Sequence, residues 1–220
     1  MEKKQKLTYD LYLVNKIFKA NLKSLISVSQ DGLDEQERQY KDYFKKLQTD
    51  ETENDSLERG AHFANIHWIL LNSILLSSYS FFENHLFKLS KIVEDRLNSK
   101  IKIENIKGSG VIKYCNYLFL VGEITCANRA IKNWQDVNYF QKVRNLIAHN
   151  GGMMITDPTK KLENHECFKF LKRHTVIMAG TFGHIRIRDL TLIETFCNIS
   201  STLSDNLTQE IEKKYFKNNC

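Results

Sequence analysis

The chain has 220 residues, a hydrophobic fraction of 42% and a formal net charge of +6. This length and composition exclude a disordered chain and fit one folded domain, with or without a long helical extension. The net positive charge is compatible with an anionic partner such as RNA but does not establish one.

The five cysteines are widely spaced and include no Cys-x-x-Cys pair. We therefore expect neither a disulfide framework nor a zinc knuckle, and reduced thiols fit a cytoplasmic protein. The charged segment Met1–Lys6 is not followed by a long apolar core, so no signal peptide is expected. The most apolar stretch, Ile66–Leu89, is interrupted by polar residues, which favours a buried helix over a membrane span.

Two helices are predicted near the N-terminus. Apolar residues at helical spacing predict a helix over Thr8–Ser27, and Gly32 is expected to break it. A second, highly charged helix is predicted over Leu33–Leu47, where acidic residues precede lysines as the helix dipole prefers. The acidic and polar stretch Thr49–Ser56 is expected to be a loop.

The longest helix is predicted to follow Gly60 and to cover about Ala61–Leu97. Its middle is apolar nearly all round, which indicates a helix packed on several sides. Asn98–Gly110 reads as a glycine-containing loop, and Val111–Val121 as a short apolar helix. Residues 127–134 fit no single type of element.

A further helix is predicted over Gln135–Asn150, ended by a left-handed cap at Asn150-Gly151-Gly152. A polar loop, Gly151–His165, follows it. Two strand-like runs, Thr175–Met178 and His184–Arg188, then predict a hairpin with its turn at Thr181-Phe182-Gly183.

The final helix is predicted over Asp189–Phe216, with Asp189 as its N-cap. The elements together predict an all-α fold, a helical bundle with a small β-hairpin inserted before the last helix. We expect residues 61–220 to form this bundle and residues 1–60 to form a helical extension packed on it.

The segment Val143–Gly152 carries the candidate site. Asn145 and His149 are four residues apart and share one helical face, and the long side chain of Arg144 can reach the same edge. A neutral imidazole can accept the proton of a ribose 2′-hydroxyl, and a guanidinium can hold two phosphate oxygens. Spacing alone also fits a helix-capping histidine and a solvated arginine, which are the more common roles.

The run Arg144-Asn145-Leu146-Ile147-Ala148-His149 resembles the signature of the HEPN ribonucleases: an arginine, a polar neighbour and a histidine a few residues on. The extension Asn150-Gly151-Gly152 is similar to one prokaryotic branch, in which a hairpin and a last helix follow the motif. The run Tyr79–Leu86 is similar to the family's earlier helix, which carries a glutamate in an aromatic setting, here Glu83. The resemblance covers about Ala61–Asp205.

The resemblance implies an all-α homodimer in which the two motif helices face each other. Each active site would then use Arg144 and His149 from both chains, with Asn145 beside them. It implies an endoribonuclease that acts as a toxin or an abortive-infection effector in phage defence. The chemistry of 2′-oxygen attack itself predicts that no metal or other cofactor is needed, because the nucleophile is already in the substrate, and it favours single-stranded RNA. The protein partner of such an effector would be an antitoxin or another defence protein. One subgroup carries a tyrosine that its antitoxin modifies, and that position is Gly151 here, so this control is not expected.

Several assignments stay open. Glu83 either orients Arg144 or His149, or is a buried acid paired with a base such as His85 or His62. His165 and Cys167 are too few to suggest a metal site. Six basic residues form either an RNA-binding surface around the hairpin or a solvated face: Lys160, Lys161, Lys172, Arg173, Arg186 and Arg188. The alternatives to the enzyme are a catalytically silent protein that binds RNA or a partner protein, and a structural dimerisation domain.

Overall fold

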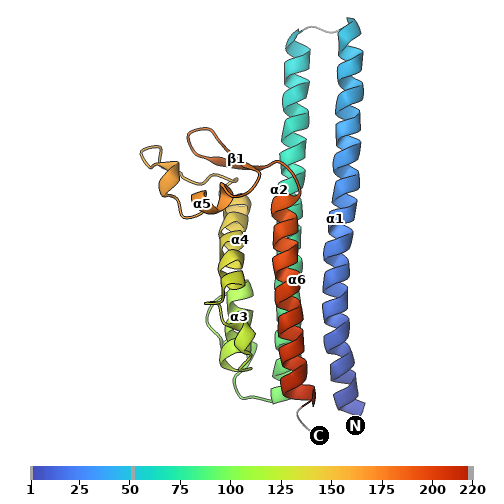
Figure 1. Cartoon of the computed structure of the whole chain (residues 1–220). Coiled ribbons are helices and arrows are strands. Elements are labelled where there is room, and N and C mark those ends of the chain that lie inside the picture. The colour runs from blue at the N-terminus through green and yellow to red at the C-terminus, as the bar shows by residue number, and fades with distance from the viewer. Residues whose placement is uncertain (1, 51–52, 218–220) are drawn as a thin grey trace. The chain divides into compact units, whose positions relative to one another are not determined.

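The computed structural model describes residues 2–50 and 53–217. Within them the chain is mostly helical, with one two-stranded hairpin before the last helix, so the predicted fold class is confirmed (Figure 1). The helices are α1 (Glu2–Asp50), α2 (Glu53–Leu97), α3 (Gly110–Leu120), α4 (Lys132–His149), α5 (Phe168–Leu171) and α6 (Thr191–Glu212). The strands are β1 (Val176–Ala179) and β2 (His184–Ile187).

Helix α1 is continuous, so the predicted break at Gly32 is wrong. Gly32 does not have a positive φ, and a glycine inside a helix costs only about 1 kcal/mol relative to alanine. The buried stripe of α1 continues on both sides of it, through Leu22, Ser29 and Leu33. One glycine is therefore too weak a signal to end a helix whose apolar face continues.

The predicted loop at Thr49–Ser56 is also wrong where the structure describes it. Residues 49–50 belong to α1 and residues 53–56 to α2, while residues 51–52 lie outside the described part. Gly60 lies inside α2 rather than before it, and α1, with 49 residues, is the longest helix of the described chain. Acidic and polar composition does not distinguish a loop from an exposed helix, which such residues also suit.

The remaining helices and the hairpin agree with prediction to within a few residues, which is the usual ambiguity of element ends. The strands pair antiparallel, with Val176 opposite Ile187 and Ala179 opposite His184. The segment that fitted no element, residues 127–134, contains the end of a 3-10 turn, Thr125–Ala127, and the start of α4. The short helix α5 was not predicted.

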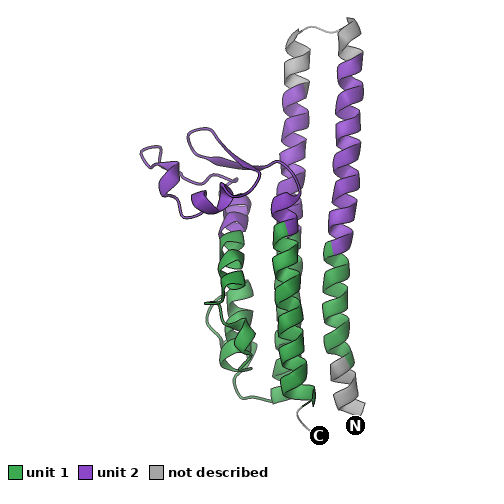
Figure 2. Cartoon of the chain, in the orientation of Figure 1, with its two compact units in different colours: residues 1–22, 78–141, 195–220 green, residues 23–77, 142–194 purple. Residues whose placement is uncertain are grey.

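The contacts divide the chain into two compact units (Figure 2). Unit 1 comprises residues 1–22, 78–141 and 195–220, and unit 2 comprises residues 23–77 and 142–194. The division of the chain at residue 60 stays a prediction.

The core of unit 1 is aromatic. The ring of Phe196 on α6 lies 5.6 Å from that of Tyr79, 5.9 Å from that of Phe82 and 5.0 Å from that of Phe140. Phe82 in turn lies 6.0 Å from Trp134 on α4. These contacts pack α2, α4 and α6 together within unit 1.

A buried polar chain joins three helices of unit 1. His85 on α2 stacks on Phe18 of α1 at 4.3 Å, and its Nε2 lies 2.6 Å from the Ser204 hydroxyl on α6. That hydroxyl donates to the amide oxygen of Asn15, so His85 is the donor to Ser204. Asn15 donates in turn to Asp205 at 2.9 Å. Burial lowers the pKa of His85 to about 3.

Among the described residues, no helix is both long and apolar enough to cross a membrane.

Candidate active site at the end of helix α4

The end of α4 has the cap that the sequence predicts. Gly151 and Gly152 have φ values of 58° and 81°, in the left-handed region that favours glycine. The N–H of Gly152 donates to the carbonyl of Leu146 at 2.9 Å, so the glycine turn folds back on the last turn of the helix. The helix therefore stops directly after His149.

Backbone hydrogen bonds fix the segment after α4 to the hairpin of unit 2. The N–H of Ile185 donates to the carbonyl of Gly152 at 2.9 Å, and Met153 forms an isolated bridge with His184. The N–H of Met154 donates to the carbonyl of Phe182 at 3.1 Å. The chain directly after α4 is thus anchored to the hairpin.

Arg144, Asn145 and His149 come together on this last part of α4. Arg144 Nη1 donates to Asn145 Oδ1 at 3.0 Å and makes a longer contact, 3.5 Å, with His149 Nε2. Because a guanidinium has donors and no acceptor, this contact is a hydrogen bond when Nε2 is the unprotonated nitrogen of the ring. Asn145 and His149 are exposed, and Arg144 is half-buried.

The two parts of the Arg144 guanidinium differ in exposure. Its Nε is covered by protein and has no hydrogen-bond partner among the described residues, whereas Nη1 reaches the exposed Asn145 and His149. An unprotonated imidazole nitrogen beside a guanidinium is the pair of groups that a proton transfer next to a phosphate requires. The other donors of the guanidinium fork suit phosphate oxygens.

Glu83 lies half-buried on α2 in unit 1, beside the start of α3. A Cβ on Gly110, the first residue of α3, would stand 3.1 Å from its carboxylate. Negative charge is favourable at a helix N-terminus. The alternative reading, a buried acid paired with a base such as His85 or His62, differs from the structure in that Glu83 is only half-buried and His85 Nε2 bonds Ser204. Its orienting role toward Arg144 or His149 stays a prediction.

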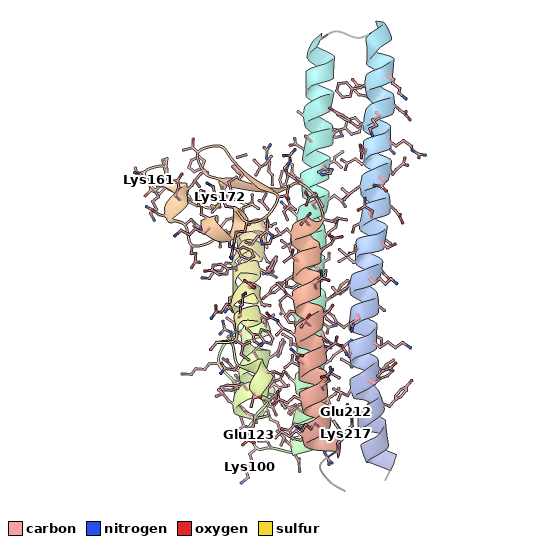
Figure 3. The ribbon with its side chains drawn as sticks, viewed as in Figure 1. Lys100, Glu123, Lys161, Lys172, Glu212 and Lys217 are labelled. Atoms are coloured by element: carbon pink, nitrogen blue, oxygen red, sulfur yellow. The ribbon has the colours of Figure 1, made fainter. Side chains whose placement is uncertain are left out.

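The six basic residues predicted as an RNA-binding surface are all exposed and all belong to unit 2. Lys161 and Lys172 are labelled in Figure 3. Lys172 Nζ lies 5.0 Å from the centre of the Phe168 ring, and the Arg173 guanidinium lies 5.5 Å from the centre of the Phe170 ring. Their role in binding RNA stays a prediction.

Three of these basic residues border hollows, which are different ones. Lys160 and Lys161 line one of about 590 Å³ together with His165. Arg188 lines another of about 400 Å³, whose walls include Tyr40 and Phe63.

Comparisons with known proteins assign no family to the chain: no protein-family model, curated protein or solved structure matches it. The HEPN resemblance therefore rests on the motif and its order along the chain, and the function has to be argued from the geometry of the site.

His165 and Cys167 interact through the backbone, since the N–H of Cys167 donates to His165 Nδ1 at 3.2 Å. In the described part of the chain, no three His, Cys, Asp or Glu side chains are grouped as a metal ion would require.

One feature of unit 1 was missed by the sequence analysis. Lys91, Lys102 and Lys113 line a hollow of about 500 Å³ together with Phe87 and Tyr114. Its residues come from α2, from the loop after it and from α3, so their proximity could not be read from spacing on one helix. The one sequence feature that points to this hollow is the excess of basic residues between Lys88 and Lys113.

Proposed function

We propose that the chain is a HEPN-type endoribonuclease that cuts single-stranded RNA by attack of the 2′-oxygen on the adjacent phosphate. The observation that carries this proposal is the contact of Arg144 Nη1 with both Asn145 Oδ1 and His149 Nε2 at the exposed end of α4. A phosphate-binding group and a proton acceptor thus stand side by side where a polynucleotide can reach them.

In the proposed reaction, His149 Nε2 accepts the proton of the 2′-hydroxyl as the 2′-oxygen forms a bond to phosphorus. The bond from phosphorus to the 5′-oxygen breaks, and that oxygen leaves with a proton supplied by an imidazolium. Arg144 binds the phosphate oxygens, on which negative charge increases in the transition state. The products are a 2′,3′-cyclic phosphate and a 5′-hydroxyl.

This chemistry needs no metal ion, because the nucleophile is already part of the substrate and the guanidinium meets the charge on the phosphate. Asn145 has a positioning role: it accepts a hydrogen bond from Arg144 and holds the guanidinium next to His149. Single-stranded RNA is the favoured substrate because in-line attack requires a backbone that is free to leave helical geometry.

The proposed active unit is a homodimer. One chain offers one imidazole in this motif, whereas the reaction needs a proton acceptor and a proton donor on opposite sides of the phosphate. A two-fold axis near α4 would place two copies of Arg144 and two of His149 around one phosphate.

In the cell, we propose a role as a toxin or abortive-infection effector, controlled by an antitoxin or another defence protein. The second candidate function is a catalytically silent partner that binds RNA or protein. It is favoured by the occupation of Arg144 Nη1 by its own neighbours, since a guanidinium held within the chain is less available to a phosphate.

Incubation of the purified protein with total cellular RNA in EDTA, followed by mapping of the new ends, separates the two candidates. The nuclease produces discrete cuts with 5′-hydroxyl ends. Intact RNA that nevertheless binds to the protein would favour the silent partner.

A further inference from the structure

The hollow bordered by Phe87, Tyr114 and three lysines in unit 1 has the chemistry of a nucleotide site. It has a volume of about 500 Å³ and lies between the end of α2, the loop after it and the start of α3. None of the residues singled out for catalysis by the motif contributes to it.

Aromatic surface is available at this hollow. Phe87 is 38% exposed, and its ring centre lies 5.5 Å from that of the half-buried Tyr114, with 54° between the ring planes. An exposed phenyl ring next to lysines is the arrangement on which bases of single-stranded nucleic acids stack.

The local charge is positive. The stretch from Lys88 to Lys113 has seven basic and three acidic side chains, a surplus of four in a chain whose net charge is +6. Of the two acidic residues that line the hollow, Glu94 is nearly buried and already bonded to Lys91. The second, Glu104, is exposed, so the lining has three lysines against two glutamates and a net charge of +1.

The walls are held in place from within unit 1. Glu94 Oε1 accepts a hydrogen bond from the N–H of Ile103 at 2.7 Å, which fixes the loop to α2. The side chain of Asn105 accepts from the N–H of Lys102 at 2.7 Å. Lys113 Nζ contacts the carbonyl of Glu104 at 3.4 Å with one of its three donors. A fixed site of this kind loses little entropy when a ligand binds.

We propose that this hollow binds one nucleotide unit, with the base stacked on Phe87 and the phosphate held by Lys102 and Lys113. Its source is either a nucleotide within an RNA strand or a free nucleotide, since both present the same base and phosphate. The first source rests on the proposed function and makes the hollow an RNA subsite apart from the Arg144–His149 pair.

The test measures binding by the full-length protein of a short fluorescein-labelled RNA that carries 2′-O-methyl groups and resists cleavage by 2′-oxygen attack. Phe87→Leu keeps the apolar bulk and removes the aromatic face. It should weaken binding about 5-fold to 150-fold, because base stacking contributes about 1–3 kcal/mol. Phe119→Leu is the matched control, because Phe119 is 37% exposed and also lies in unit 1. It should bind like the wild type.

The salt dependence of RNA binding tests the contact with the phosphate. Lys113→Gln should lower the slope of log affinity against log salt concentration by about 0.7, the value for one lost contact with a single strand. Lys23→Gln, an exposed change on α1, should leave the slope unchanged.

Calorimetry with adenosine monophosphate distinguishes the two sources of the nucleotide. Phe87-dependent binding of the monophosphate alone identifies a free nucleotide, and Phe87-dependent binding of the oligomer identifies a strand. Equal binding by the Phe87→Leu and Phe119→Leu variants would overturn the proposal, as would failure of the wild type to bind either ligand. RNA cleavage together with binding that does not depend on Phe87 would overturn the nucleotide site and leave the proposed nuclease standing. Phe87-dependent binding without RNA cleavage would overturn the proposed nuclease and leave the nucleotide site standing.

Discussion

At the scale of single residues, Glu83 has one contact that the structure shows and one role that stays a prediction. The resemblance gives it an orienting role in the active site, whereas its carboxylate stands against Gly110 at the start of α3. A charge at that position stabilises a helix by about 0.3–1 kcal/mol. The contact therefore supports a part in holding α3 within unit 1.

We expect Glu83→Gln to lower stability modestly and to reduce RNA cleavage far less than His149→Ala does. The amide keeps the shape of the side chain but loses the charge that favours the N-terminus of α3. Thermal unfolding and a gel-based cleavage assay measure the two effects. A folded Glu83→Gln protein as inactive as His149→Ala would instead make Glu83 part of the catalytic machinery.

His85 gives a prediction about pH. Its side chain is 2% exposed, and burial lowers its pKa to about 3 from an ordinary value near 6.5. Between these two pH values, His85 is protonated in the unfolded chain and neutral in the folded chain. The stability that His85 contributes is therefore lost as the pH falls below about 6.5. From pH 7 to pH 5 the loss should be about 2 kcal/mol.

Urea unfolding of wild type and His85→Gln at both pH values measures this contribution. The variant should be less stable at pH 7 and should lose about 2 kcal/mol less than wild type on acidification. His62→Gln, a change at an exposed histidine, should keep the wild-type pH dependence. Parallel pH dependences for His85→Gln and wild type would show that His85 is not the group responsible.

At the scale of secondary structure, α1 offers the clearest test, because it runs through Gly32. Gly32 is exposed, has no positive φ, and a Cβ there would meet no described atom within 4 Å. Gly32→Ala should therefore raise the free energy of unfolding by about 0.5–1 kcal/mol.

The contrasting control is Gly151→Ala. A Cβ at Gly151 would also meet open space among the described residues, but φ is 58°, so alanine should destabilise by about 1–2 kcal/mol. Urea midpoints of the two variants should move in opposite directions. Destabilisation by Gly32→Ala would indicate the helix break that the sequence first suggested.

The elements that the sequence predicted well have local signals. The Asn150-Gly151-Gly152 run ends α4 as expected, and the alternation of Ile185 and Ile187 with exposed residues marks β2. The ends of α1 and α2 were missed because acidic and polar residues suit exposed helix as well as loop. The four-residue α5 is too short to produce a periodic pattern.

The same distinction applies to the candidate site. Arg144, Asn145 and His149 could be brought together from sequence because all three lie on one helix, where spacing sets geometry. The contact of Glu83 with Gly110 and the chain from His85 through Ser204 to Asn15 join residues far apart in sequence. No helical or strand period relates such residues.

At the scale of the whole molecule, the proposed active site depends on a second copy of the chain. We predict a homodimer at micromolar concentration, with the α4 helices of the two copies near the two-fold axis. Light scattering coupled to size exclusion measures the mass, and one protomer has a mass of 25.8 kDa.

The position of the interface has a separate test. An excess of inactive Arg144→Ala or His149→Ala protein is added to the wild type. Either variant should lower the wild-type activity, because it forms mixed dimers with wild-type chains. A monomer that cuts RNA at full rate would contradict shared active sites, as would wild-type activity that the variants leave unchanged.

The central claim is that His149 and Arg144 direct attack by the substrate's own 2′-oxygen. Its most direct test is cleavage, in EDTA, of a single-stranded RNA with and without one 2′-O-methyl group at the mapped cut site. We predict cleavage of the unmodified strand to a 2′,3′-cyclic phosphate and a 5′-hydroxyl, and none at the methylated position. His149→Ala and Arg144→Ala should each lose about 10²–10⁴ in rate. Cleavage of the methylated RNA, or an absolute requirement for magnesium, would contradict the account.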